Sequence, residues 1–186
     1  MMNERVWLVG AWLVAASILG MTDSATAEEI YTATLIASDG MGADRKADLK
    51  LTIKQRTTDE ESAELQKILE EEGSDALFAK LRTWDKGLAE IRGSASQKIL
   101  HVRVFPGENG SRVIIVTEGQ LYMPDRSQDP RLANALGFIQ LDVGTRGRGE
   151  GIAAPIEGVS VTDEGVLQLV TEGRARIRLE NVAREN

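Results

Sequence analysis

The sequence predicts an α+β domain: a mostly antiparallel β-sheet of about eight or nine strands, arranged as a sandwich or a partly open barrel, with one inserted helical hairpin packed on it. Two observations lead to this fold class. Short runs that alternate apolar and polar residues recur every ~8–12 residues, as in antiparallel strands joined by tight turns. One stretch, residues 57–84, instead repeats its apolar residues at helical spacing. Regular alternation of strands with helices is missing, so a parallel doubly wound sheet is not expected.

The strand patterns begin before the helical stretch. Residues 30–36 and 47–54 alternate apolar with polar side chains, and Asp39-Gly40-Met41-Gly42 between them is typical of a turn. After the helices, strands are expected at residues 99–105, 111–117, 139–143, 152–154, 159–161, 166–170 and 175–179, with residues 88–92 as a further short candidate. Asn109-Gly110 predicts one hairpin, and Glu172-Gly173 predicts another between the last two strands. Residues 113–116 are apolar on both faces, so this strand is expected to be central or covered by the helices.

Residues 57–61, Thr-Thr-Asp-Glu-Glu, have the pattern of a helix start. Either threonine fits a capping box, in which a hydroxyl and a carboxylate bind unpaired backbone N–H groups, because a glutamate follows each threonine three residues later. The acidic first turn also suits the positive end of the helix dipole. Gly73 is expected to end this helix, and Ser74 is expected to cap a second one that reaches Trp84.

The two helices are expected to bury one shared side. The apolar residues at helical spacing are Leu65, Ile68 and Leu69 in the first helix and Leu77, Phe78 and Leu81 in the second. The run Glu70-Glu71-Glu72 is interpreted as a solvated face and not as an acidic site, since such charge runs are usually exposed.

The amino terminus has the pattern of a signal peptide. Arg5 precedes an apolar run of ~15 residues, and the polar stretch after it ends in the small-residue cleavage site Ala25-Thr26-Ala27. The run is shorter than the ~20 residues of a membrane-spanning helix, which makes a retained anchor the weaker alternative. We expect cleavage after Ala27, a periplasmic or secreted domain of residues 28–186, and no stable membrane anchor on that domain.

Composition and charge exclude several classes of function. The chain has 186 residues, no cysteine, one histidine and a formal net charge of −7. The negative charge argues against binding to nucleic acid or to an anionic membrane surface. The lack of cysteine excludes disulfides, thiolate catalysis and cysteine-ligated zinc. No cofactor motif or metal-ligand spacing is present, so neither a cofactor nor a metal is expected.

Part of the sequence resembles a known group of proteins. The segments that carry the resemblance are Thr57-Thr58-Asp59-Glu60-Glu61, Val116-Thr117, Ile139-Gln140-Leu141-Asp142 and Gly147-Arg148-Gly149-Glu150-Gly151, after an exported start. Together they are similar to uncharacterised exported bacterial proteins. The resemblance covers most of the mature chain and implies no activity and no site residues.

The most distinctive candidate site is a row of arginines. Arg174, Arg176 and Arg178 alternate with apolar residues, so in a strand their guanidinium groups share one face. With Arg103 on another strand, they could bind a small anionic ligand, because each arginine offers a planar fork of donors. The alternative is an ordinary solvated face whose arginines pair with acids such as Asp142 or Glu172.

Three functions remain open on the sequence alone. A non-enzymatic binding or interaction module of the cell envelope is favoured, with a small anion or an envelope protein as its partner. The second is a hydrolase whose site is assembled from loop residues such as Asp125 and Asp129 with His101, which can titrate near neutral pH. For His101 a packed or surface position is the ordinary alternative. The third is a structural envelope protein.

Overall fold

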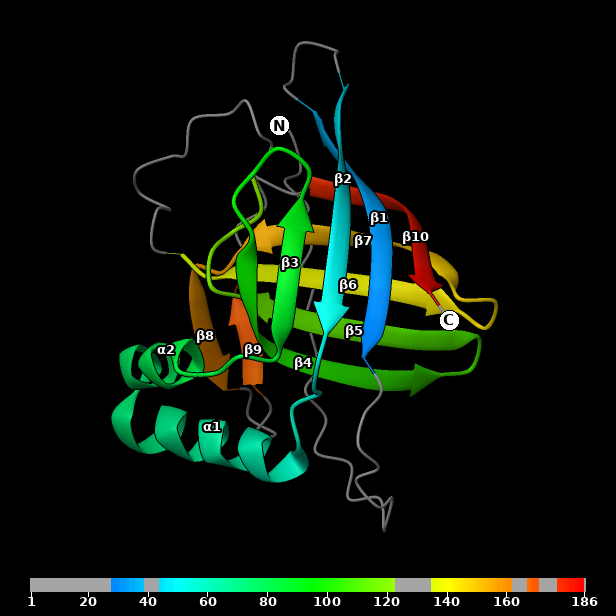
Figure 1. Ribbon diagram of the computed structural model, residues 1–186. Helices are drawn as coiled ribbons and strands as arrows, with labels where there is room; N and C mark the ends of the chain where they lie inside the picture. Colours follow the sequence, from blue (N-terminus) through cyan, green and yellow to red (C-terminus); the bar gives the residue numbers. More distant parts are fainter. Residues whose placement is uncertain (1–27, 39–43, 123–134, 162–166, 171–176, 186) are drawn as a thin grey trace, which may run out of the picture.

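The computed structural model describes residues 28–38, 44–122, 135–161, 167–170 and 177–185 (Figure 1). In chain order its elements are β1 (Glu29–Ser38), β2 (Asp44–Ile53), α1 (Asp59–Glu72), α2 (Ser74–Arg82), β3 (Gly87–Ile91), β4 (Gln97–Gly107), β5 (Gly110–Thr117), β6 (Gly137–Gly144), β7 (Arg148–Pro155), β8 (Gly158–Val161), β9 (Leu167–Val170) and β10 (Ile177–Glu185).

Eight of these strands form a closed barrel in the order β1-β10-β7-β6-β5-β4-β3-β2, and β8 and β9 form a separate two-stranded sheet. Neighbouring barrel strands are antiparallel, and apart from the closing pair of β1 with β10 they follow one another in the chain, with two insertions. The insertions are the helices between β2 and β3 and the β8–β9 pair between β7 and β10. The mostly antiparallel sheet is therefore confirmed. It closes fully, in place of the expected sandwich or partly open barrel, because β1 pairs with β2 on one side and β10 on the other.

The barrel interior is filled by apolar side chains. Residues from every barrel strand contribute, among them Tyr31, Leu35, Leu49, Leu51, Ile91, Ile99, Val102, Ile115, Ile139, Leu141, Ala153 and Leu179. Eight strands enclose a space just wide enough for side chains to fill. Each Leu or Ile removed from water contributes about 1.5–3 kcal/mol, so this interior is the main core of the fold.

A second core lies outside the barrel, under the helices. Leu65, Leu77 and Leu81 of the helices pack with outward-facing residues of the wall, including Leu100, Ile114 and Phe138. Ile68 and Leu69 are partly buried against the same cluster. The wall is thus apolar on both faces, as expected for residues 113–116. In Figure 1 the helices lie outside the barrel at the lower left.

The helix boundaries agree with their sequence signals apart from the cap of α2 and its end, which lies at Arg82 and not at Trp84. Thr58 is the residue that caps α1: the Glu61 N–H donates to Thr58 Oγ1 at 3.2 Å, and the Thr58 N–H donates to Glu61 Oε2 at 2.9 Å. Gly73 ends α1 with φ of 89°, a conformation that favours glycine. Ser74, however, is the first residue of α2 and not its cap, because Gly73 also serves as the N-cap.

The last strands pair differently from the prediction. Instead of forming a hairpin with the strand before it, β10 lies between β1 and β7, while β9 pairs with β8. The expected hairpin around Glu172-Gly173 is therefore wrong. The partner that β10 finds, β1, comes from the opposite end of the domain, and no local pattern points to it.

Candidate functional site

Strand β4 extends beyond the end of its neighbour β3, and the segment just before α1 pairs with the part of β4 that β3 leaves uncovered. The β3–β4 pairing runs from Ala89–Gln97 to Gly87–Ile99 and goes no further. Beyond it, the Thr57 N–H donates to the Val102 carbonyl at 2.9 Å, and the Val102 N–H donates to Thr57 Oγ1 at 3.0 Å. The segment before α1 is thereby tied to the barrel wall. We call this region the α1–β4 junction, defined by Thr57, Thr58, Glu61, Lys86, His101 and Arg103.

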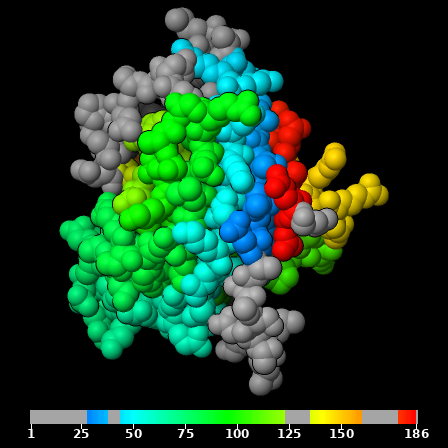
Figure 2. All heavy atoms as spheres, viewed as in Figure 1, coloured from blue at the N-terminus to red at the C-terminus, as the bar shows by residue number. Residues whose placement is uncertain are grey.

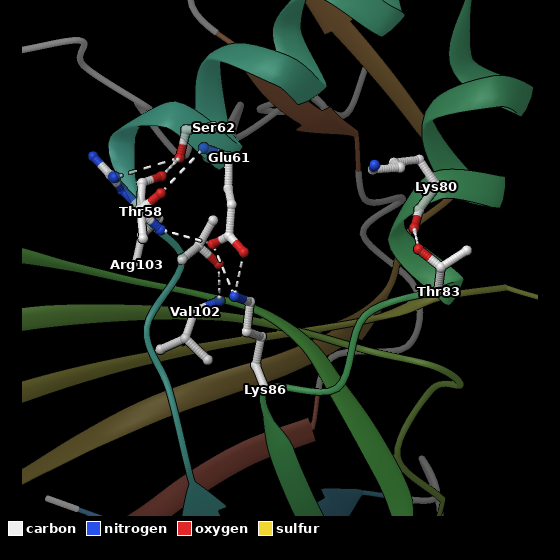
Figure 3. Close-up of polar contacts among 9 residues, drawn as sticks. Thr58, Glu61, Ser62, Lys80, Thr83, Lys86, Val102 and Arg103 are labelled. Carbon is white, nitrogen blue, oxygen red and sulfur yellow. Dashed lines mark hydrogen bonds and ion pairs between the residues drawn. The ribbon is translucent and has the colours of Figure 1, made fainter. Parts of the chain in front are cut away.

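The centre of the α1–β4 junction is an ion pair between Glu61 and Lys86 (Figure 3). Lys86 Nζ lies 2.6 and 2.8 Å from the two carboxylate oxygens of Glu61. Only 5 % of the Lys86 side chain is exposed, against 28 % for Glu61. Lys86 Nζ also lies 5.3 Å from the centre of the Trp84 ring, a cation–π distance. Glu61 therefore both caps α1 and neutralises a buried cation.

These contacts set the charge of Glu61. Partial desolvation acts to raise the pKa of its carboxyl group, but the hydrogen bonds from Lys86 and from the Thr58 N–H lower it. The net result is a pKa below the ordinary value, so Glu61 is ionised at neutral pH.

Arg103 extends the junction along α1. Its Nη1 atom lies 2.6 Å from Asp59 Oδ1 and 3.3 Å from Ser62 Oγ. Its guanidinium carbon lies 6.0 Å from the centre of the Phe105 ring. With 19 % of its side chain exposed, Arg103 is engaged with the first turn of α1.

A β-bulge determines the position of His101. The β4–β5 pairing shifts between Ile99 and His101, so that Leu100 is an extra residue. Ile99 and Val102 both belong to the barrel interior, whereas Leu100 belongs to the outer cluster. Regular alternation along the expected strand at residues 99–105 predicts one common face for Leu100, Val102 and Val104. This prediction is wrong at Leu100, because the bulge interrupts the alternation.

His101 is 4 % exposed, and its Nδ1 atom has no hydrogen-bond partner among the described residues. Burial lowers its pKa to about 3, with the positive charges of Arg103 and Lys86 acting in the same direction and Glu61 acting against them. His101 is neutral at physiological pH. To act as a base it would have to become a cation while buried in the barrel wall, which desolvation disfavours. Its proposed hydrolase partners, Asp125 and Asp129, lie outside the described residues.

The arginines predicted to bind a ligand are not all brought together. Arg174 and Arg176 lie outside the described residues. Arg178, on β10, is 58 % exposed and forms long ion pairs with Asp44 at 3.5 Å and Glu180 at 3.6 Å. Arg103 is on β4, and three strands separate β4 from β10 in either direction around the barrel. The structure thus places Arg103 and Arg178 on opposite walls.

A second cluster, which the sequence analysis did not identify, centres on Glu29 at the start of β1. Its carboxylate accepts from Arg56 Nε at 2.7 Å and from the Tyr31 hydroxyl at 3.1 Å, and it lies 3.1 Å from Arg184 Nη2. Burial, together with the charge of Glu29 and the hydrogen bond to it, raises the pKa of Tyr31 to about 12. We call this set of four residues the Glu29 clamp. It joins β1, β10 and the segment before α1, and no local sequence signal links residues so far apart.

Within the described ranges, no group of three or more His, Asp or Glu side chains is arranged to hold a metal ion. None of the described helices combines the length and apolar character needed to cross a membrane. No protein-family model, curated protein or solved structure matches this chain.

Proposed function

We propose that the protein is an exported, non-enzymatic interaction module of the cell envelope, and that it binds a basic segment of another envelope protein. The docking face in this proposal is the outer side of α1 and α2, the helices that cover one wall of the barrel. Figure 2 shows the contrast between walls: the helices form the lower left of the surface, whereas β1, β2 and β10 face solvent directly.

The observation that carries this proposal is the distribution of charge. Residues 28–186 contain 27 acidic and 21 basic residues, a formal charge of −6. Helix α1 alone has seven acidic residues and one lysine, which is also −6. Lys86, Arg103 and Lys80 each pair with one acid of α1, which reduces the charge of this wall without removing it. A basic partner would be attracted to this side of the domain.

The end of α1 adds a second argument. Its last turn contains Glu70, Glu71 and Glu72 and no basic residue, although the carboxyl end of a helix dipole disfavours negative charge. The amino end of α2 begins at Ser74 and offsets part of this cost. Gln66 donates to Glu70 at 2.9 Å and Lys67 Nζ lies 4.0 Å from Glu71, and these contacts offset a further part. The run still exposes three carboxylates next to one another, and residues that break a local rule are expected at functional surfaces.

Apolar side chains border the same wall. Seven of them are only partly buried: Ile68, Leu69, Phe78, Trp84, Phe105, Ile152 and Val159. Binding sites combine such apolar area, which supplies affinity, with charged groups that supply orientation and selectivity. The partner that fits is therefore an amphipathic basic segment.

Two alternatives are less well supported. The expected hydrolase would use His101 as its acid or base, and such a group must exchange protons near the working pH, whereas His101 is buried and its pKa is lowered to about 3. A small anion would need free guanidinium groups, whereas Arg103 and Arg178 both pair with acids.

Binding of designed peptides tests the proposal. The probes are a fluorescent amphipathic Lys/Leu peptide and its Glu/Leu counterpart, measured by anisotropy at low and at moderate salt. We expect the basic peptide to bind with a salt-dependent affinity, which Glu60→Lys/Glu72→Lys weakens at least about tenfold. Both residues are exposed on α1.

The matched control is Glu90→Lys/Glu185→Lys, which changes the net charge equally at exposed positions on β3 and β10. It should leave the affinity within about twofold. Equal weakening by both double variants would show general attraction to a negative protein and would overturn the docking face. Failure of the basic peptide to bind would overturn the proposal, and failure of both peptides would favour a structural envelope protein.

A further inference from the structure

The folded domain begins almost at the expected cleavage site. Glu28 is exposed, and β1 starts at the next residue. Glu29 pairs with Ile53 of β2, and Ile30 pairs with β2 and β10 at once. If cleavage occurs after Ala27, one residue separates the scissile bond from a strand held on both sides.

The Glu29 clamp fixes this first strand residue further. The Glu29 side chain is 7 % exposed, and Arg56 and Arg184 approach it from two other segments of the chain. Withdrawing Glu29 from the sheet would break its ladder pairing, two ion pairs and the hydrogen bond from Tyr31 together.

We propose that the folded barrel protects the bond between Ala27 and Glu28, so that the signal peptide must be removed before β1 enters the sheet. This inference rests on the proposed export. Cleavage is a hydrolysis: water adds across the peptide bond, Ala27 gains a carboxylate, and Glu28 gains the new α-ammonium group. A peptidase binds the residues on both sides of the scissile bond as an extended strand, which pairs with its own backbone. Residues 29 and 30 already use their backbone groups in the barrel.

The order of events follows from this geometry. A precursor that folds before it meets the peptidase is cleaved only when β1 opens locally, so its cleavage rate is the rate of an unfolded chain multiplied by the open fraction. Export of an unfolded chain, with cleavage before barrel closure, avoids that block. The Glu29 clamp then forms on a chain whose amino terminus is already free.

The experiment compares cleavage of the full-length precursor by a purified signal peptidase in detergent. One sample is folded, and the other is unfolded in urea and diluted directly into the reaction. A third sample is a folded variant with Gly-Ser-Gly-Ser inserted between Glu28 and Glu29. A fourth is folded Glu29→Gln, which removes the charge of the clamp. Near-ultraviolet circular dichroism verifies folding of each sample that should be folded.

We expect the folded precursor to be cut at least about tenfold more slowly than the unfolded one. The insertion should restore rapid cleavage without unfolding the barrel, and Glu29→Gln should restore it in part. Equal rates for the folded and unfolded precursors would overturn the inference while leaving the proposed export intact. If no form, including the insertion variant, is cut after Ala27, the expected cleavage site is wrong, and the export proposal fails with the inference.

Discussion

In the Glu29 clamp the anion is the buried member, whereas in the α1–β4 junction it is the cation. Glu29 is 7 % exposed beside arginines that are 40 % and 46 % exposed. Lys86 is 5 % exposed beside a glutamate that is 28 % exposed. A buried ion that loses its partner is far more costly than an exposed one, because water cannot replace the lost contact. The comparison teaches that each cluster is most sensitive to loss of its more exposed member.

The largest effect is expected from Glu61→Gln in the α1–β4 junction. Glutamine keeps the geometry of the capping box but leaves Lys86 buried without its counter-ion. We expect the free energy of unfolding to fall by about 3 kcal/mol, measured by urea denaturation. The control is Glu64→Gln, which removes a more exposed pair with Lys80 and should cost at most about 1 kcal/mol. Equal losses would contradict the role assigned to burial of Lys86.

The next largest effect is a dependence of stability on pH, caused by His101 in the same junction. The pKa of His101 is 6.5 in the unfolded chain and about 3 in the folded one. Between these values the unfolded state binds a proton that the native state does not, so stability is complete above pH 6.5 and declines as the pH falls. The decline approaches about 1.4 kcal/mol per pH unit.

His101 is the only histidine of the chain, which gives a clean window. The pKa of Glu61 is lowered from 4.5 on folding, so the stability that its ionised carboxylate contributes is lost only as the pH falls below 4.5. Urea titrations between pH 4.5 and 6.5 therefore report mainly on His101. In His101→Leu the slope in this window should be largely absent. A slope that persists in this variant would show that other groups cause it.

The smallest effects are expected in the Glu29 clamp, because Glu29 has two cationic partners. Arg56→Met or Arg184→Met alone should cost about 1 kcal/mol, since the other arginine still faces the carboxylate. The double variant leaves Glu29 buried without a cationic partner, so its free energy of unfolding should fall by more than the sum of the two single losses. Thermal unfolding of the four forms measures this coupling.

Arg178→Met is the exposed reference for the clamp, because among the described residues that guanidinium forms long ion pairs with Asp44 and Glu180, and it should change stability by no more than about 0.5 kcal/mol. Strictly additive losses for Arg56 and Arg184 would mean that each arginine binds Glu29 independently. That result would remove the distinction between the clamp and ordinary surface pairs.

Features with a local cause were predictable from the sequence. The capping box of α1 could be seen as a threonine followed three residues later by a glutamate, and the strands by their alternation. The helix-to-wall packing followed from the apolar spacing of Leu65, Ile68 and Leu69. These patterns depend on residues within a turn or two of one another.

Features that depend on distant pairing were not predictable. Closure of the barrel requires β1 to meet β10, and the alternation in each strand is the same whether a sheet closes or stays open. The bulge at Leu100 has no sequence marker, so the face of Leu100 was assigned wrongly. Lys86 and Glu29 gave no signal, because each one is buried by segments far away in the chain.

Closure between the first and last strands also has a kinetic consequence. The residues that pair between β1 and β10 are separated by almost the whole domain sequence. The chain therefore loses conformational entropy in bringing its two ends together before the β1–β10 pairing can form. Domains with such high contact order fold slowly. Until β10 joins the sheet, β1 and β7 are exposed edges that can pair with other chains. An emerging chain of this kind is a natural client for a chaperone that shields strand edges.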